Sequence, residues 1–216
     1  MPHDNVILAF DTSAAHCAVA LVSGGRIIAE TVEEMTKGQA ERLFPLIQDL
    51  LLGAGLAWKD IARIGVGIGP GNFTGIRISV AGARGLSLSL GVPAIGVSAF
   101  EALGCGLDGK IIASVDARGG KCYLKDLTQD RDPIMVNVAD AAHVVAGSDF
   151  QVTGYKAEEI ARTAGAKAIL QPTPIAVAIA LITARRDPAN QGRPAPLYIR
   201  APDAAPSRQT VPTILP

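Results

Sequence analysis

The chain has 216 residues, 49% of them apolar, and its 20 basic side chains balance its 20 acidic ones. That length can bury a core in one large domain or two small ones. The balanced charge and the 4% aromatic content argue against a protein that grips nucleic acid by itself, because such binding needs clustered positive charge and stacking surfaces. No apolar run approaches the roughly 20 residues of a membrane helix, and no basic start precedes an apolar signal core. We therefore expect neither a membrane span nor a secretion signal.

The first hundred residues predict an α/β unit. Short apolar runs bounded by Gly, Pro, Asp or Ser are typical of strands, and apolar residues spaced three to four apart are typical of helices. In chain order we expect strands at residues 6–10, 17–22 and 26–32, a helix at 40–52, a strand at 64–68, a helix at 74–90, a strand at 94–97 and a helix from 99.

A glycine-rich turn separates the strand at 64–68 from the helix that follows. Gly67, Gly69 and Gly71 alternate along it, and Thr74 opens the helix. Glycines let the backbone turn tightly, and the start of a helix presents unpaired N–H groups to an anion. The turn lacks the Gly-Lys-Ser/Thr of a Walker loop and the third glycine of a dinucleotide fingerprint. The sequence thus leaves two interpretations open, a structural turn and a phosphate-binding loop.

The helix at 74–90 is rich in small side chains, which allow another helix or a subunit to approach closely. Its only charges are Arg77 and Arg84, seven residues apart and therefore on one face. They are either solvated at the surface or paired with a partner or a phosphate.

A similar order of elements begins again after residue 100. We expect strands at residues 111–115, 122–127 and 134–138, a helix near 139–146, a strand at 150–153 and helices at 156–164 and 175–186. Asp116 closes the first of these strands, as Asp11 closes the first strand of the chain. We infer a duplicated α/β fold of two subdomains, residues 1–100 and 101–216. Ligands in such sheets bind at the carboxyl ends of strands, so we expect Asp11, Gly69 and Asp116 to lie at a cleft between the subdomains.

The end of the chain differs in composition. From residue 193 onward it is rich in proline and alanine, so we expect an extended or disordered tail in which only residues 197–199 can pack.

The cysteines and histidines show no spacing typical of a metal site. The three cysteines, Cys17, Cys105 and Cys122, are far apart and form no Cys-x-x-Cys pair, which favours three small side chains in a reducing cytoplasm over a disulfide framework or a zinc site. The three histidines lack the spacings of a zinc protease, and they suggest no serine triad. We predict no metal site and no catalytic residue.

Several sequence blocks occur in an order that is specific to one family. They are Ile7-Leu8-Ala9-Phe10-Asp11-Thr12-Ser13, Ala40-Glu41-Arg42-Leu43, Gly69-Pro70-Gly71-Asn72-Phe73-Thr74-Gly75-Ile76-Arg77, Gly96-Val97-Ser98, Val115-Asp116-Ala117-Arg118 and Pro196-Leu197-Tyr198-Ile199-Arg200. With these blocks in register over nearly the whole chain, the sequence resembles the TsaB family, also called YeaZ.

The resemblance implies the actin-like (ribonuclease H-like) fold that sugar kinases and heat-shock ATPases share. It implies a subunit that is not itself an enzyme and that helps to install threonylcarbamoyladenosine beside the anticodon of ANN-decoding tRNAs. The implied partners are the catalytic paralog TsaD and the small ATPase TsaE, with a homodimer when the protein is alone and with tRNA bound only through the complex. Members often have His where this chain has Gln39.

Two groups of candidate site residues follow. The cofactor-binding candidates, for ATP or ADP at the partner interface if any cofactor binds, are Asp11, Thr12, Gly69, Gly71, Thr74 and Asp116. The partner-interface candidates, on the helices at 40–52 and 74–90, are Glu41, Arg42, Gly75, Arg77, Ala81 and Arg84.

The first group keeps an alternative function open, an actin-like ATPase or kinase with Asp11 or Asp116 on magnesium. A glycoprotease, a label that has followed this superfamily, finds no residue set for peptide hydrolysis in this sequence.

Overall fold

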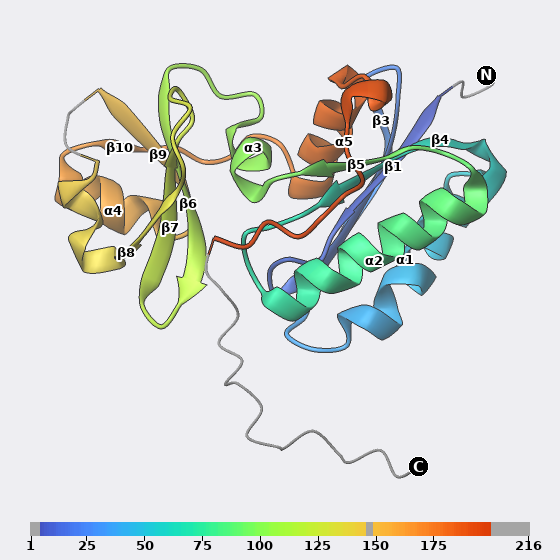
Figure 1. Cartoon of the computed structure of the whole chain (residues 1–216), viewed down its shortest axis with the longest axis horizontal. Coiled ribbons are helices and arrows are strands. Elements are labelled where there is room, and N and C mark those ends of the chain that lie inside the picture. Colours follow the sequence, from blue (N-terminus) through green and yellow to red (C-terminus); the bar gives the residue numbers. More distant parts are fainter. Residues whose placement is uncertain (1–4, 146–148, 200–216) are drawn as a thin grey trace, which may run out of the picture.

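The computed structural model describes residues 5–145 and 149–199 and contains two five-stranded sheets (Figure 1). The first sheet has the order β3-β2-β1-β4-β5, formed by β1 (Val6–Asp11), β2 (His16–Ser23), β3 (Arg26–Glu34), β4 (Ile61–Gly67) and β5 (Ala94–Val97). The second has the order β10-β9-β6-β7-β8, formed by β6 (Lys110–Arg118), β7 (Lys121–Asp126), β8 (Ile134–Asn137), β9 (Phe150–Gly154) and β10 (Lys167–Ala168). The α-helices are α1 (Gln39–Gly53), α2 (Phe73–Leu90), α3 (Ala99–Gly104), α4 (Ala157–Ala164) and α5 (Ile175–Arg185), and the 3₁₀ helices are η1 (Trp58–Asp60), η2 (Val138–His143) and η3 (Pro188–Asn190).

The two sheets repeat one topology. In the first, β1 pairs antiparallel with β2 and parallel with β4, and in the second β6 pairs in the same two ways with β7 and β9. A third antiparallel strand and a further parallel strand complete each sheet on opposite sides. The duplicated α/β fold that the sequence predicts is therefore confirmed.

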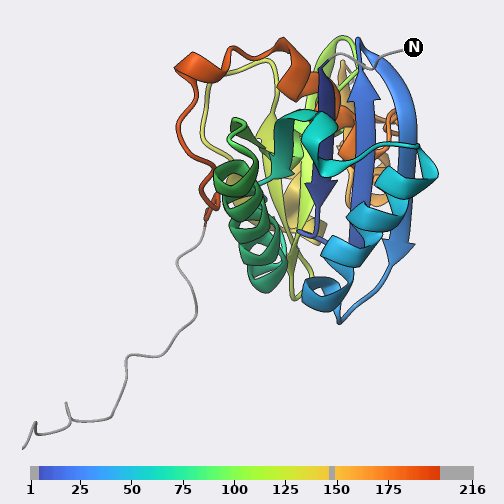
Figure 2. The same cartoon turned by 90° about the vertical axis from the view of Figure 1, so that its right-hand side faces the viewer.

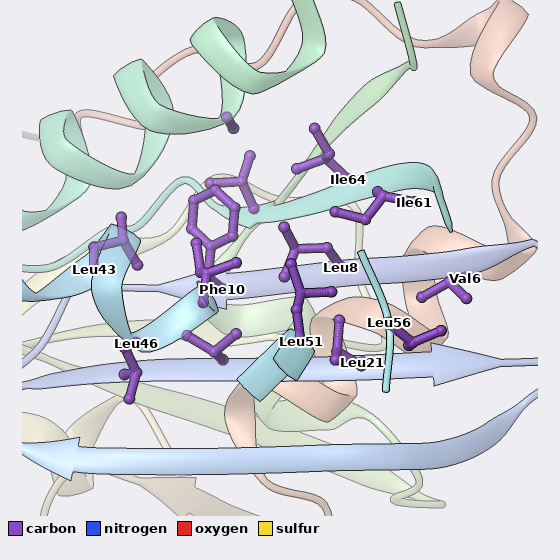
Figure 3. Packing of buried hydrophobic residues seen from close by; sticks show 14 of the residues in the cluster. Val6, Leu8, Phe10, Leu21, Leu43, Leu46, Leu51, Leu56, Ile61 and Ile64 are labelled. Carbon is purple, nitrogen blue, oxygen red and sulfur yellow. The ribbon is translucent and has the colours of Figure 1, made fainter. Parts of the chain in front are cut away.

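Both faces of the first sheet are covered at β1, which explains the unbroken apolar run of that strand. Val6, Leu8 and Phe10 point toward α1 and α2 and belong to the main apolar cluster (Figure 3). Ile7 and Ala9 point to the other face, where α5 covers them. Successive side chains of a strand alternate between faces, so a strand covered on both sides needs apolar residues at every position.

The last α-helix, α5, follows the strands of the second sheet but packs against the first sheet. α5 packs against β1, β2 and β4 through apolar side chains such as Val177 and Ile179. Figure 1 shows it beside the first sheet. The division into residues 1–100 and 101–216 stays a prediction, and the packing places α5 with the first sheet although it lies in the predicted second subdomain.

A few predicted boundaries differ from the structure. β6 continues past Asp116 to Arg118, because Gly119 and Gly120, with φ of 60° and 73°, make the turn to β7 only after it. The helix predicted near 139–146 is instead the 3₁₀ helix η2 within the described residues. The two-residue β10 has no apolar run that would reveal it in the sequence.

Residues 193–199, called the C-terminal segment below, have no regular secondary structure but pack closely on the first half of the molecule. The N–H of Leu197 donates to the carbonyl of Ile68 over 2.8 Å, and Pro194 is buried beside Gly96. Ile199 packs against the apolar cluster around Phe100. Figures 1 and 2 show the segment along the side of α2 that faces away from α1. The rest of the predicted tail, residues 200–216, lies outside the described residues.

Candidate functional site

A cleft of about 880 Å³ lies between the two sheets, at the ends of β1 and β6. Its walls come from the loop after β1, the glycine-rich turn before α2, the start of α3 and the end of β6. Residues from both halves line it, including Asp11, Ser13, His16, Gly71, Asp116 and Tyr155.

Asp11 is the buried charge of this cleft, with 2% of its surface exposed. One carboxylate oxygen, Oδ2, accepts hydrogen bonds from the N–H of Ser13 over 3.0 Å and from the hydroxyl of Ser13 over 2.9 Å. The same oxygen lies 2.8 Å from Nε2 of His16. A buried carboxylate is costly unless it is paired and hydrogen-bonded, and here the chain itself supplies the partners.

The carboxylate of Asp11 changes the pKa of His16. Burial alone would lower the pKa of its imidazole, but the hydrogen bond and the charge of Asp11, with a smaller contribution from Glu34, raise the pKa above the usual value for histidine. A protonated His16 therefore forms a partly buried ion pair with Asp11.

The glycines of the turn are explained by contact with the loop after β1. A Cβ at Gly67 would overlap the carboxylate of Asp11, and a Cβ at Gly71 would overlap the carbonyl oxygen of Ser13. A Cβ at Gly75, in the first turn of α2, would overlap the carbonyl oxygen of Thr12. Only residues without a side chain allow this approach, so the structural interpretation of the turn accounts for these three glycines.

Hydrogen bonds close the same contact. The hydroxyl of Thr12 donates to the carbonyl of Gly75 over 2.6 Å, and the N–H of Asn72 donates to the carbonyl of Ser13 over 2.6 Å. Asn72 also caps α2, since its side chain accepts from the N–H of Thr74.

The six cofactor-binding candidates are only partly brought together. Asp11, Gly71 and Asp116 line the cleft, with Asp116 exposed on the opposite wall and accepting from the N–H of Arg118. Thr12, Gly69 and Thr74 are not part of its lining. Within residues 5–145 and 149–199, no group of three or more His, Cys, Asp or Glu side chains is placed to hold a metal ion, and all three cysteines are free and buried.

The partner-interface candidates lie on α1 and α2. Arg77, Ala81, Arg84 and Leu88 follow each other at helical spacing and are all exposed, forming one stripe along α2. On α1, Glu41 and Phe44 are exposed, and Phe44 lies beside Gly82 of α2. These six residues, Glu41, Phe44, Arg77, Ala81, Arg84 and Leu88, are called the helical face below.

Two candidates have other roles. Gly75 is buried against Thr12 and so does not belong to the helical face, which corrects its placement at a partner surface. Arg42 forms a two-pronged ion pair with Glu33, at 2.7 and 2.8 Å, and a further one with Asp49 at 3.1 Å. Its guanidinium lowers the pKa of Glu33, chiefly through that hydrogen bond.

Sequence reasoning missed His16 as a residue of the site and assigned no role to Gln39. His16 stands alone in the sequence, and only the turn after β1 brings it to Asp11. Gln39 is buried at the start of α1, where its side-chain amide donates to the carbonyl of Met35 and ties the helix to the end of β3. The signal that pointed to this position was the histidine that members of the family often have there.

Sequence comparisons agree with this architecture. A family model described as TsaD, tRNA N6-adenosine threonylcarbamoyltransferase, matches residues 13–184. TsaB of Escherichia coli K12 is 36% identical over 133 residues, which is 59% of this chain and 57% of that protein. The chain belongs to the TsaD family, as a member of its TsaB (YeaZ) branch. The matched regions span 52–59% of the first curated TsaB relatives, little more than half their length.

Two further proteins match the TsaB-branch chain over most of its length. An uncharacterized protein of Mycobacterium tuberculosis H37Rv is 29% identical over 207 residues, 94% of this chain and 95% of that one. The solved structure of YeaZ from Pseudomonas aeruginosa has a TM-score of 0.70 and 26% identity, covering 90% of this chain and all of that one.

A more distant structure, component A of (R)-2-hydroxyglutaryl-CoA dehydratase from Acidaminococcus fermentans, shares the fold with a TM-score of 0.54 at 11% identity. It covers 83% of this chain and 98% of that one. The expected actin-like fold is thereby confirmed. Among the described residues, no helix combines the length and the apolar character that a membrane span requires.

Because Gly75 contacts Thr12 and a Cβ at Gly85 would contact nothing, a change of glycine to alanine should have opposite effects on stability at these two positions of α2. Gly75→Ala should lower the free energy of unfolding by about 2 kcal/mol or more, because the new methyl group meets backbone that cannot yield. Gly85→Ala should raise it by about 0.5–1 kcal/mol, since nothing lies near that position and alanine favours a helix. Urea unfolding of the three proteins measures both changes, and equal stability of the two variants would contradict the contact.

The ion pair of His16 predicts a pH-dependent stability. Because the pKa of His16 is raised in the folded protein above its ordinary value of 6.5, the stabilisation is complete below that pH and is lost as the pH rises through the folded-state pKa. The difference in unfolding free energy between the wild type and His16→Gln should thus be larger near pH 5.5 than near pH 8.5. His143→Gln, at an exposed histidine of η2, controls for loss of an imidazole. A difference that is flat with pH would refute the ion pair.

Proposed function

We propose that the protein is a non-catalytic subunit in the biosynthesis of threonylcarbamoyladenosine in tRNA, acting as the partner of a TsaD-type catalytic subunit. Membership of the TsaB branch supports this, since TsaB of E. coli is named as a biosynthesis protein for that modification. The observation that carries the non-catalytic part is the state of Asp11, whose oxygen Oδ2 already accepts from Ser13 and lies against His16 of the same chain.

Polar groups near Asp11 also have hydrogen-bond partners within the chain. The hydroxyl of Thr12 donates to the carbonyl of Gly75, and the N–H of Thr74 at the start of α2 donates to the side chain of Asn72. These are the groups that a phosphate or a magnesium ion at the strand end would need.

Peptide hydrolysis finds no support in the geometry either. A nucleophilic serine needs a base within hydrogen-bond reach. The hydroxyl of Ser13 donates to Asp11 instead, and His16 binds the same carboxylate oxygen, so the two do not form a nucleophile and base pair.

The proposal assigns partner binding to the helical face. The small side chain of Ala81 permits close contact, and the exposed Phe44 and Leu88, at 43% and 87%, supply apolar area to bury. Glu41 and, at its edge, Arg42 extend this surface on α1. The proposed complex also includes a TsaE-type ATPase, binds tRNA only when assembled and works in the cytoplasm, and the protein alone pairs with itself through the same face.

A second candidate, an ATP-binding ATPase or kinase, is favoured by one observation. The cleft is large enough for a nucleotide, and Asp11 and Asp116 face it from opposite walls.

Depletion of this protein in its own cells should remove threonylcarbamoyladenosine from tRNA, as measured by mass spectrometry of digested nucleosides. The pure protein should hydrolyse no Mg-ATP above the level of an Asp11→Asn control. A normal nucleoside content after depletion contradicts the proposed function. Robust turnover that Asp11→Asn abolishes would establish the ATPase instead.

Ala81→Lys should block partner binding without unfolding the protein. Ala81 is exposed in the middle of the helical face, so a long charged side chain there keeps the partner away. We expect at least about tenfold weaker binding of the TsaD-type subunit from the same organism by calorimetry. Ala184→Lys, at an exposed alanine of α5, makes the same change away from the helical face and should bind normally. Equal binding of both variants would remove the helical face from the proposal.

A further inference from the structure

The two arginines of the helical face are held by a part of the chain more than a hundred residues away. Nε of Arg77 donates to the hydroxyl of Tyr198 over 3.0 Å, and Nε of Arg84 donates to the carbonyl of Pro194 over 2.7 Å. Both acceptors belong to the C-terminal segment. The segment therefore binds each guanidinium group on one edge.

An aromatic ring also lies against the guanidinium group of Arg77. The guanidinium carbon of Arg77 lies 3.7 Å from the centre of the Phe73 ring, and the rings of Phe73 and Tyr198 are 4.9 Å apart. A stacked face together with a bonded Nε leaves a planar guanidinium little freedom to rotate. The two terminal nitrogens of this fork then stand in a set direction.

Those terminal nitrogens have no partner in the described part of the chain. Neither Arg77 nor Arg84 makes a hydrogen bond there through its outer nitrogens, and no carboxylate of the described residues lies within ion-pair distance. No acidic residue occurs between Ile64 and Phe100, so the charge of the two arginines is uncompensated along the whole of α2.

We propose that the C-terminal segment orients Arg77 and Arg84 as two preset forks for a pair of carboxylates on the partner protein. This inference rests on the proposed function and names the chemistry that its helical face recognises. At 1.5 Å per residue, seven residues place the forks about 10 Å apart along α2, so the partner presents its two acidic side chains at about that spacing.

A protein surface fits this stripe better than RNA. Only two cations stand along it, and between and beyond them lie the apolar Ala81 and Leu88, the latter 87% exposed. Two phosphate contacts give weak binding, whereas bidentate arginine pairs beside apolar contact are typical of protein interfaces. Pre-orienting the forks also lowers the entropy that each arginine loses on binding.

The test measures binding of the TsaD-type subunit from the same organism, by calorimetry, to the full chain and its variants. Arg77→Gln and Arg84→Gln should each weaken binding by about tenfold or more. Arg77→Lys, which keeps the charge but not the planar fork, should also bind more weakly than the wild type. Arg162→Gln, on the exposed surface of α4, removes the same charge elsewhere and should bind within about twofold of the wild type.

The role of the C-terminal segment is tested separately by Tyr198→Phe. This variant keeps the ring against Phe73 and loses only the hydroxyl that holds Arg77. It should weaken binding by about threefold in the wild type and have no further effect in Arg77→Gln, because the two changes act through one group. Equal effects in both backgrounds would overturn the positioning role.

Other outcomes separate this inference from the proposed function. If the wild type does not bind the TsaD-type subunit, the proposed function fails. If it binds and both glutamine variants bind equally well, with melting temperatures unchanged, the carboxylate forks are overturned. Arginine-dependent binding of purified tRNA to the protein alone would overturn them in favour of RNA.

Discussion

The backbone contact between the glycine-rich turn and the loop after β1 is the constraint on which the rest of the structure depends. Gly71 and Gly75 bring the turn and the first residues of α2 against the carbonyl oxygens of Ser13 and Thr12. Two short hydrogen bonds, from Thr12 and from Asn72, fix the approach. This contact sets where α2 starts on the first sheet, and it also sets the position of the helical face, because α1 packs beside α2.

The same contact decides the chemistry of the cleft. It brings the glycine-rich turn onto the end of β1, where a ligand phosphate would lie in a sheet of this kind. At that strand end, the chain itself supplies three partners to one carboxylate oxygen of Asp11. The surface that we propose for partner binding is the outer side of the helices, where the arginines of α2 carry charge without a counter-charge on their own helix. The proposed partner surface therefore lies apart from the cleft, because none of the six residues of the helical face lines it.

The sequence allowed most strands and helices to be predicted, because β1, β4 and β6 are apolar runs with clear ends and α2 starts directly after the glycines. The sequence indicated that a similar order of elements occurs twice along the chain, but it did not indicate which strands are neighbours within each sheet. The role of the glycines could not, since spacing along the chain does not show what lies where a Cβ would be. The pairing of His16 with Asp11 and that of Arg77 with Tyr198, 121 residues away, depend on tertiary packing and leave no periodic signal. The return of α5 to the first sheet escaped prediction for the same reason, because an apolar helix does not reveal which sheet it covers.

α5 is synthesised after the second sheet, but it packs on the first sheet. The face of the first sheet that holds Ile7 and Ala9 stays open to water until residues 175–185 have emerged and packed on it. The strands that begin the chain therefore close their core last, after the whole second sheet has been made. Contacts of such long separation in sequence slow folding and prolong the exposure of apolar strand surface. The strands of the first repeat therefore cannot complete their core from residues 1–100 alone, because α5, which follows the second sheet, covers one of their faces.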